Sequence, residues 1–175
     1  MNIRSSINKV AATAALGFGL AATCVLPSLA QDKTITWGKP AEITGFDVHV
    51  AGTVASWEMY QMIYETLLAA DENLNLEGAL AESWEQTSPT SYVFKIRDGA
   101  AFSNGRAVTP ADVIGSLERI KDPETASYWS HQLGDIAKME AIDDHTVSVE
   151  LAARQPPLLT ALAPIPASMR PIEEV

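Results

Sequence analysis

Few side chains in this 175-residue sequence could do chemistry, and none of them forms a known catalytic or metal-binding pattern. The three histidines, His49, His131 and His145, do not lie at the short spacings typical of metal ligands, and no cysteine follows residue 24. Neither Gly-x-Ser-x-Gly nor His-Glu-x-x-His occurs, and there is no glycine-rich phosphate loop. We therefore predict a protein that is not an enzyme and has no metal site and no cofactor.

The acidic side chains have structural explanations as well. Two acidic pairs, Asp71-Glu72 and Asp143-Asp144, fall in segments that indicate turns, where solvation explains them. Asp112 lies in the first turn of a predicted helix, where the helix dipole favours a negative charge. We predict no catalytic acid or base among these residues.

Residues 1–30 have the features of a secretory signal peptide. Two basic residues precede an apolar run over residues 10–26, and small residues end at Ala30. We expect cleavage after Ala30 and export to the periplasm. An uncleaved membrane anchor is less favoured because the run is short and interrupted by glycine and threonine. A lipid anchor on Cys24 is less favoured because Ala-Ala-Thr before it fits lipoprotein processing poorly.

The composition after this cleavage indicates an acidic protein that does not bind nucleic acid. Loss of residues 1–30 would leave 10 basic and 22 acidic side chains, a net charge of −12. Charge of that sign repels a phosphate backbone. The single cysteine would leave with the signal, so residues 31–175 would have no disulfide. A packed core must stabilise them, as one domain or as part of a larger one.

The beginning of the mature chain predicts a strand, an irregular segment and a helix. Thr34 to Trp37 is rich in β-branched and aromatic residues, which predicts a strand with Trp37 in the core. From Ser56 to Leu68, apolar residues recur at spacings of three and four. This pattern predicts a helix with Ser56 as its N-cap.

Two segments with alternating apolar and polar residues, Ala81 to Gln86 and Ser91 to Arg97, predict paired strands. The apolar face of the second strand consists of Tyr92, Phe94 and Ile96. Trp84, inside the first strand, is predicted to lie in the core.

A tight turn and a well-defined helix are predicted next. Asn104 and Gly105 tolerate positive φ, which favours a turn. Thr109 is a good N-cap, and Pro110 fits the first helical position, where its missing N–H would have no partner. The buried stripe of the helix is expected to consist of Val113, Leu117 and Ile120. The helix should end before Pro123, because a residue that precedes proline is driven out of the helical region.

The last third of the chain predicts one more hairpin and the beginning of a helix. Residues 124–135 form either a short helix or an ordered loop. Alternation in Ile136 to Ile142 and in Thr146 to Leu151 predicts two strands joined by a turn that contains His145. A further helix is expected to begin at Leu158.

Three stretches, in this order, resemble one protein family. They are IYETLLAADENLNLEGALAESWE, YVFKIRDGAAFSNGRAVTPADVIGSLERIKDP, and IDDHTVSVEL with a Pro-Pro pair after it. On these residues the chain resembles the N-terminal part of the bacterial extracellular solute-binding proteins of the peptide/nickel group, over about residues 34–167. Many members have Phe-His-Asp-Gly where this chain has Phe-Ser-Asn-Gly, a difference that keeps the turn chemistry.

The resemblance implies a mixed α/β (α+β) fold that is part of a two-lobed periplasmic-binding-protein type II architecture. This chain would supply the first strand segment of the main lobe and most of the accessory mixed-sheet domain. Residues 1–30 would be the signal peptide, and residues 31–175 a truncated N-terminal part of the solute-binding domain without the second lobe.

The resemblance also implies a function, that of the extracytoplasmic substrate-binding component of an ABC import system. Such a protein captures a peptide or a similar small solute in a cleft between its lobes and delivers it to permease subunits at the inner membrane. Peptide is the most frequent solute class in the group, and a complete protein would be a monomer. A truncated remnant that serves as a structural or interaction domain stays open as an alternative, and a secreted hydrolase is a weaker one.

By the same resemblance, four side chains are candidate solute contacts. Residues 49–57 and the loop with Tyr128 and Trp129 would face the cleft. Trp57, Tyr128 and Trp129 offer flat surfaces for stacking, and His49 offers a polar contact. Trp57, Trp129 and His49 have structural alternatives, because a tryptophan is often a core residue and a histidine is often a surface residue.

Overall fold

The computed structural model describes residues 35–39, 41–154 and 158–174. Its helices and strands, in chain order, are α1 (Val54–Tyr60), β1 (Leu68–Ala70), β2 (Leu76–Gly78), β3 (Ala81–Gln86), β4 (Ser91–Ile96), α2 (Pro110–Lys121), β5 (Ile136–Ala141), β6 (Thr146–Leu151) and α3 (Leu158–Ala161). The 3₁₀ turns are η1 (Pro123–Thr125), η2 (Ser130–Leu133), η3 (Ile165–Ala167) and η4 (Ile172–Glu174). The chain divides into two units, residues 1–37 and residues 38–175, and all these elements belong to the second. The predicted signal peptide lies outside the described residues.

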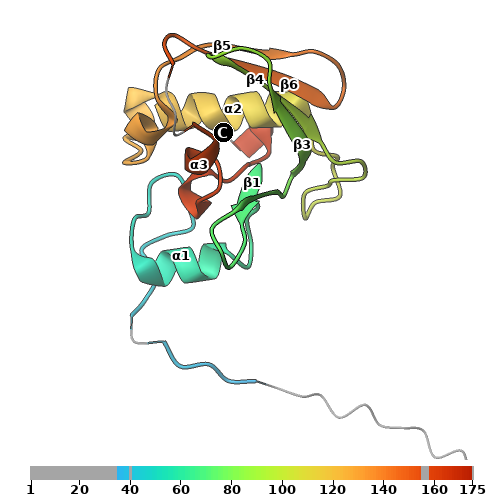
Figure 1. Ribbon diagram of the computed structural model, residues 1–175. Coiled ribbons are helices and arrows are strands. Elements are labelled where there is room, and N and C mark those ends of the chain that lie inside the picture. The colour runs from blue at the N-terminus through green and yellow to red at the C-terminus, as the bar shows by residue number, and fades with distance from the viewer. Residues whose placement is uncertain (1–34, 40, 155–157, 175) are drawn as a thin grey trace, which may run out of the picture. The chain divides into compact units, whose positions relative to one another are not determined.

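A four-stranded antiparallel sheet in the order β3-β4-β6-β5 dominates residues 38–175 (Figure 1). It consists of the two predicted hairpins, which are joined edge to edge because β4 pairs with β6. Phe94 on β4 is opposite Trp84 on β3 and Val147 on β6. A separate two-stranded sheet is formed by β1 and β2. The mixed α/β fold class and the pairing within both hairpins are confirmed.

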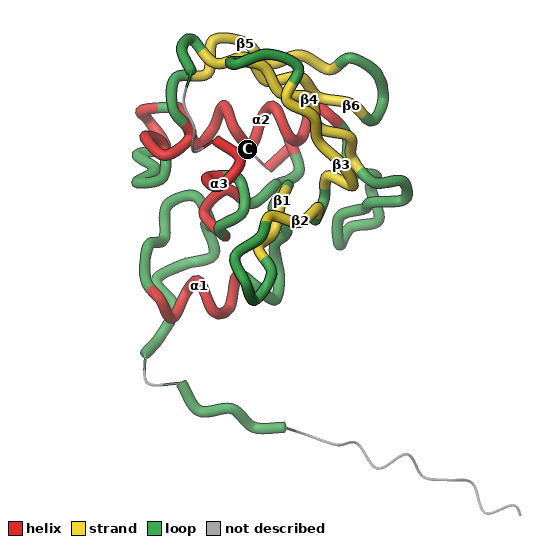
Figure 2. Tube along the Cα trace, viewed as in Figure 1, coloured by secondary structure: helices red, strands yellow, loops and turns green. Residues whose placement is uncertain are grey.

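Helix α2 lies beside the four-stranded sheet and packs against β5 and β6 (Figure 2). Apolar side chains of this helix and of the sheet belong to one core. Alternate residues of β4 and β6 are buried, as the alternation predicted. The predicted stripe of α2 is fully buried and consists of Val113, Leu117 and Ile120. Burying one such side chain stabilises a fold by about 1.5–3 kcal/mol. Trp84 is half-buried and packs against the edge of this core.

Both ends of α2 form where the sequence predicted them. Thr109 is the N-cap, Pro110 is the first helical residue, and the helix stops at Lys121, before Asp122 and Pro123. The predicted turn at Gly105 is present with a φ of +86°. These local features fix the start and the direction of the helix.

The predicted helix from Ser56 to Leu68 is wrong at both ends. Helix α1 begins earlier, because the N-cap is Thr53, whose hydroxyl accepts a hydrogen bond of 3.3 Å from the amide of Ser56. It ends at Tyr60, and Leu68 begins strand β1. The backbone before Leu68 bonds to the segment between β2 and β3 instead of to its own helix. Pairing with a distant segment therefore overrides the helical spacing of the apolar residues.

Part of the predicted first strand, Ile35 to Trp37, is described by the structure. This part does not form a strand. Trp37 is 73% exposed, so the prediction of a core tryptophan is wrong. A strand needs a paired neighbour for its stability, and none of the described strands pairs with this segment. Within the described residues, no helix combines the length and the apolar character required to cross a membrane.

A glycine at the end of β2 permits a sharp entry into β3 and gives a first testable prediction. A Cβ atom on Gly78 would lie 2.5 Å from the carbonyl oxygen of Ala81. Because this oxygen belongs to the backbone, it cannot move without displacing the start of β3. We expect Gly78→Ala to lower the free energy of unfolding by about 1–3 kcal/mol in urea titrations.

The matched control for this prediction is Gly38→Ala, where the added Cβ would meet no atom within 4 Å. The control is expected to unfold at the urea concentration of the unmodified chain. Equal midpoints for the two variants would contradict the steric explanation.

Candidate functional site

Three aromatic side chains from two distant segments meet at one place. Trp57 on α1 stacks on Tyr128, which lies between η1 and η2, with ring centroids 6.2 Å apart and planes at 15°. Tyr128 meets Trp129 edge to face, with centroids 6.3 Å apart and planes at 77°. Aromatic rings favour both arrangements. The structure thus brings together three of the four candidate residues, and their contact with a solute stays a prediction.

The loop that carries two of these rings is tied to its surroundings. The indole Nε1 of Trp129 donates a hydrogen bond of 3.0 Å to the carbonyl of Ala161 in α3, and the ring packs against the core. A Cβ atom on Gly52 would lie 3.3 Å from Cε1 of Tyr128. Because Gly52 has no side chain, the segment before α1 can lie close to the Tyr128 ring.

The stacked pair also carries two polar atoms with no partner in the described part of the chain. The Nε1 of Trp57 and the hydroxyl of Tyr128 are buried and make no hydrogen bond there. Burial raises the pKa of Tyr128, and the nearby Trp57 indole, which does not reach hydrogen-bond geometry, lowers it by less, so the hydroxyl stays protonated. An unpaired buried polar group costs about 1–3 kcal/mol. A carbonyl or carboxylate oxygen is the chemical complement of two such donors.

An open depression of about 440 Å³ borders Trp57. Its wall consists of Trp57, Gln61, Thr66, Ala69, Ala70, Ala163, Pro164, Ile165 and Pro166. Small apolar groups predominate, with two polar side chains among them, which is the composition of many sites for organic molecules. Tyr128 and Trp129 are not part of this wall, so the depression reaches the aromatic cluster only through Trp57. Another cavity, of about 260 Å³ beside Phe102, contains none of the candidate residues.

The fourth candidate, His49, is fully buried, so its interpretation as a surface residue is wrong. Its Nε2 lies 2.9 Å from the carbonyl oxygen of Ser168, and its Nδ1 lies 3.0 Å from Nη1 of Arg119. A guanidinium only donates, so Nδ1 accepts, and the ring proton lies on Nε2 and is donated to Ser168. Burial lowers the pKa of His49 to about 4, and the charges of Arg119 and Arg170 act in the same direction. Both ring nitrogens are thus used within the protein, and the geometry gives His49 a structural role.

A carboxylate two residues earlier completes this structural cluster. Asp47 accepts hydrogen bonds of 3.0 and 2.5 Å from the two terminal nitrogens of Arg119, and Nη1 of Arg170 lies 3.4 Å away. Burial alone would raise the pKa of Asp47, but the hydrogen bonds from Arg119 and from the His49 amide outweigh it and lower the pKa. The cluster therefore anchors the irregular segment that leads into α1.

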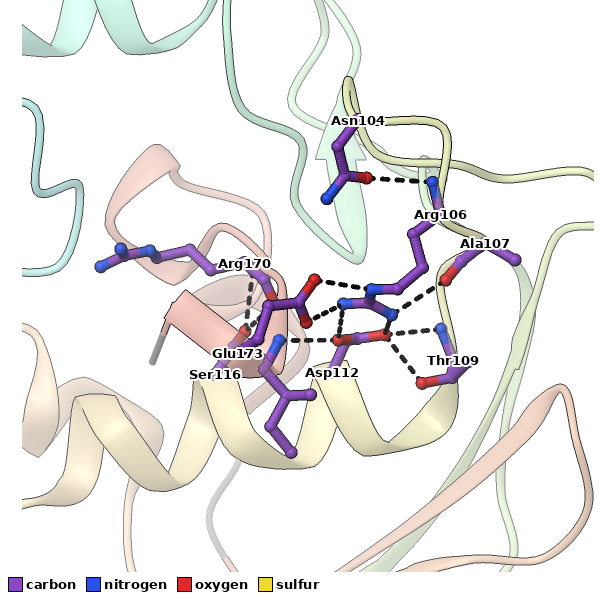
Figure 3. Close-up of polar contacts among 9 residues, drawn as sticks. Asn104, Arg106, Ala107, Thr109, Asp112, Ser116, Arg170 and Glu173 are labelled. Atoms are coloured by element: carbon purple, nitrogen blue, oxygen red, sulfur yellow. Dashed lines mark hydrogen bonds and ion pairs between the residues drawn. The ribbon is translucent and has the colours of Figure 1, made fainter.

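A second ionic cluster lies at the other end of α2 (Figure 3). Arg106 contacts the fully buried carboxylate of Asp112 on one side and Glu173 on the other. Burial would raise the pKa of Asp112, but hydrogen bonds from Arg106, Thr109 and the Ile172 amide lower it to about 2. A carboxylate with so low a pKa has no proton to donate near neutral pH and is only a weak base there.

The other two histidines, His131 and His145, are exposed and contribute to neither cluster. In the ranges that the structure describes, no group of three or more His, Cys, Asp or Glu side chains could hold a metal ion.

The sequence and the fold were compared with known proteins. Residues 75–174 match the family described as bacterial extracellular solute-binding proteins, family 5 Middle. The periplasmic oligopeptide-binding protein OppA of Escherichia coli K12 is 31% identical over 146 residues, which cover 74% of this chain and 27% of that protein. The glutathione-binding protein GsiB of the same strain is 30% identical over 138 residues, which cover 78% of this chain and 27% of that protein. Among solved structures, the binding protein AgaA from A. tumefaciens R10, in complex with agropinic acid, matches with a TM-score of 0.72 and 28% identity over 76% of this chain and 27% of that one.

The chain thus spans about a quarter of the length of the relatives that it matches. The family match covers more than half of the chain, and the relatives share its fold, which is part of the type II periplasmic-binding-protein architecture. The resemblance predicted from the sequence is confirmed. The chain belongs to the bacterial extracellular solute-binding proteins of family 5.

Proposed function

We propose that this chain is part of the extracytoplasmic substrate-binding component of an ABC import system. It would help to capture a peptide or a similar small solute in a cleft between two lobes, for delivery to permease subunits at the inner membrane. The observation that carries the proposal is the stacked Trp57–Tyr128 pair, next to Trp129 and a depression of about 440 Å³, in a chain of this family.

The relatives support this proposal and suggest the chemistry of the solute. Their names refer to oligopeptide, glutathione and agropinic acid, and all three ligands carry carboxylate or carbonyl oxygens. Such oxygens complement the unpaired donors of Trp57 and Tyr128, which are buried in the stack and become available to a solute only when the rings separate. The relatives are binding proteins and not enzymes, which agrees with a site built from aromatic rings.

The proposal includes export to the periplasm with cleavage after Ala30. It is supported by the signal-like features of residues 1–30 and by the description of the OppA relative as periplasmic.

Peptide binding to Trp57 is testable by substitution. We expect Trp57→Ala to weaken binding of a di- to pentapeptide pool by about tenfold or more, because truncation of a central aromatic contact commonly costs 2 kcal/mol or about 30-fold in affinity. Line broadening of the peptide NMR signals measures the binding and does not depend on the fluorescence of the removed tryptophan. Release of new amino groups would instead indicate a peptidase.

Trp37→Ala is the matched control, since Trp37 is 73% exposed and belongs to the other unit of the chain, residues 1–37. It is expected to bind peptides as the unmodified chain does. Equal binding by Trp57→Ala and Trp37→Ala would exclude the aromatic cluster as the site.

A structural or interaction domain that binds no solute is the second candidate function. It is favoured by the exposure of large apolar side chains at Phe46, Met62 and Ile63, which are 65%, 68% and 55% exposed. Apolar groups exposed in this way favour association with another surface. Size-exclusion chromatography separates the two candidates, because self-association without any peptide binding would support the second.

A further inference from the structure

The last turn of α2 carries two basic side chains that bond to two segments near the aromatic residues, one before Trp57 and one after Trp129. These residues, Arg119 and Lys121, are two positions apart and both are partly buried. Helix α2 is itself fixed, because its apolar stripe is buried and its first turn is capped. The two side chains therefore extend from one rigid element.

Lys121 supports the loop that carries Tyr128 and Trp129. Its ammonium group donates hydrogen bonds of 3.2 Å to the carbonyl of Ser130 and of 2.8 Å to the carbonyl of Gly134. These carbonyls stand at the start of η2 and immediately after it. A single charged donor thus links both ends of the turn that follows Trp129. Hydrogen bonds from a charged donor are stronger than those between neutral groups.

Arg119 contacts the other segment, which precedes α1 and Trp57. It binds Asp47 through both terminal nitrogens and contacts Nδ1 of His49. The chain then turns, with the amide of Ala51 donating to the carbonyl of Asp47 at 2.9 Å, and enters α1 and Trp57. A bidentate contact of this kind fixes orientation as well as distance.

The two supported segments meet in the stack of Trp57 on Tyr128, whose centroids are 6.2 Å apart. We infer that Arg119 and Lys121 are positioning residues of the aromatic site, which set the placement of the Trp57 ring relative to the Tyr128 ring. This inference rests on the proposed function for its role in binding. It concerns residues that are not part of the wall of the depression beside Trp57.

Lys121→Met tests the inference in the full chain, because methionine keeps much of the length of the side chain and removes its charge and its donors. Near-ultraviolet circular dichroism reports on the fixed contacts between the rings. We expect the part of the aromatic signal that Trp57→Ala also removes to fall to about half or less, since other ring pairs such as Tyr92–Phe94 also contribute. Peptide affinity in the NMR assay should fall about tenfold, as loss of a charged donor does elsewhere. The urea midpoint should change little, because Lys121 bonds to loop carbonyls and not to the core.

Lys95→Met is the matched control, since Lys95 forms an exposed ion pair with Glu82 on the sheet. It should retain the circular dichroism signal and the affinity. Lys121→Arg should restore both, because a guanidinium can also donate to two carbonyl oxygens.

A Lys121→Met spectrum equal to that of Lys95→Met would overturn the inference. A urea midpoint so low that part of the Lys121→Met protein is unfolded in the assay would also overturn the inference. The signal would then be lost through unfolding and not through a change in the placement of the rings. Failure of the proposed function is distinguished from these results, because the unmodified chain would then bind no peptide while the circular dichroism of the variants would still report on positioning.

Discussion

Asp112→Ala is expected to lower the free energy of unfolding by about 3 kcal/mol, the low end of the 3–5 kcal/mol seen when one partner of a buried ion pair is removed. The Asp112 carboxylate is fully buried and accepts hydrogen bonds from Arg106, from the hydroxyl and amide of Thr109, and from the amide of Ile172. Alanine leaves all these donors without that acceptor. The side chain of Arg106 is 33% exposed, so water can solvate part of its charge, which limits the loss. Urea titration with two independent probes measures the effect.

Glu173→Ala provides the control, because Glu173 binds the same guanidinium at 2.7 Å from an exposed position. An exposed partner of this kind contributes about 0–1 kcal/mol. We expect Asp112→Ala to be clearly less stable than Glu173→Ala. Similar losses in the two variants would show that the burial of the carboxylate does not determine its contribution.

The elements that the sequence predicted well are those specified by neighbouring residues. Thr109 and Pro110 define the start of α2 by local chemistry, and the alternation from Tyr92 to Ile96 matches a strand with one buried face. Helix α1 was placed incorrectly because the chain around Leu68 pairs with a segment more than ten residues away. Spacing within Ser56 to Leu68 contains no information about that partner.

The candidate site was predictable only in part, for a similar reason. Trp57 and Tyr128 were selected through a family resemblance, and the structure places their rings together. The contact between Arg119 and Asp47 spans 72 residues, and the one between His49 and Ser168 spans 119. No rule of local spacing links such pairs. They were missed, and with them the burial of His49.

A buried neutral histidine makes stability depend on pH in a defined window. The pKa of His49 is lowered from 6.5 to about 4 in the folded state, so below pH 6.5 the unfolded chain binds a proton that the folded chain does not. The contribution of His49 to stability must therefore fall as the pH decreases from about 6.5 to about 4, and this loss levels off below that. Each pKa unit corresponds to about 1.4 kcal/mol, so we expect His49 to account for a loss of about 2–3 kcal/mol between pH 7.5 and pH 4.5.

The groups around His49 explain why protonation is resisted. Burial disfavours a charged ring, and Arg119 and Arg170 already place two positive charges beside it. The hydrogen bond to the carbonyl of Ser168 and the charge of Asp47 act in the opposite direction and are outweighed. A proton on Nδ1 would face the Arg119 guanidinium at 3.0 Å and break that hydrogen bond. The pKa of Asp47 is itself below its ordinary 3.8, so its own stabilising contribution is present above that pH and is lost only below the window.

His49→Gln isolates this effect, because glutamine is neutral at every pH in the window and its amide can still donate to the carbonyl of Ser168. The exposed His131 and His145 and the distant carboxylates are retained in both proteins, so their contributions cancel in the comparison. Asp47 is also retained, and the hydrogen bond that it accepts from residue 49 comes from the backbone amide, which the substitution keeps. We expect the variant to be less stable than the unmodified chain at pH 7.5, and the difference to shrink by about 2–3 kcal/mol at pH 4.5. Urea titrations at both pH values supply the four free energies of unfolding. A difference that stays constant across the window would mean that His49 titrates normally in the folded protein, which its burial between two arginines argues against.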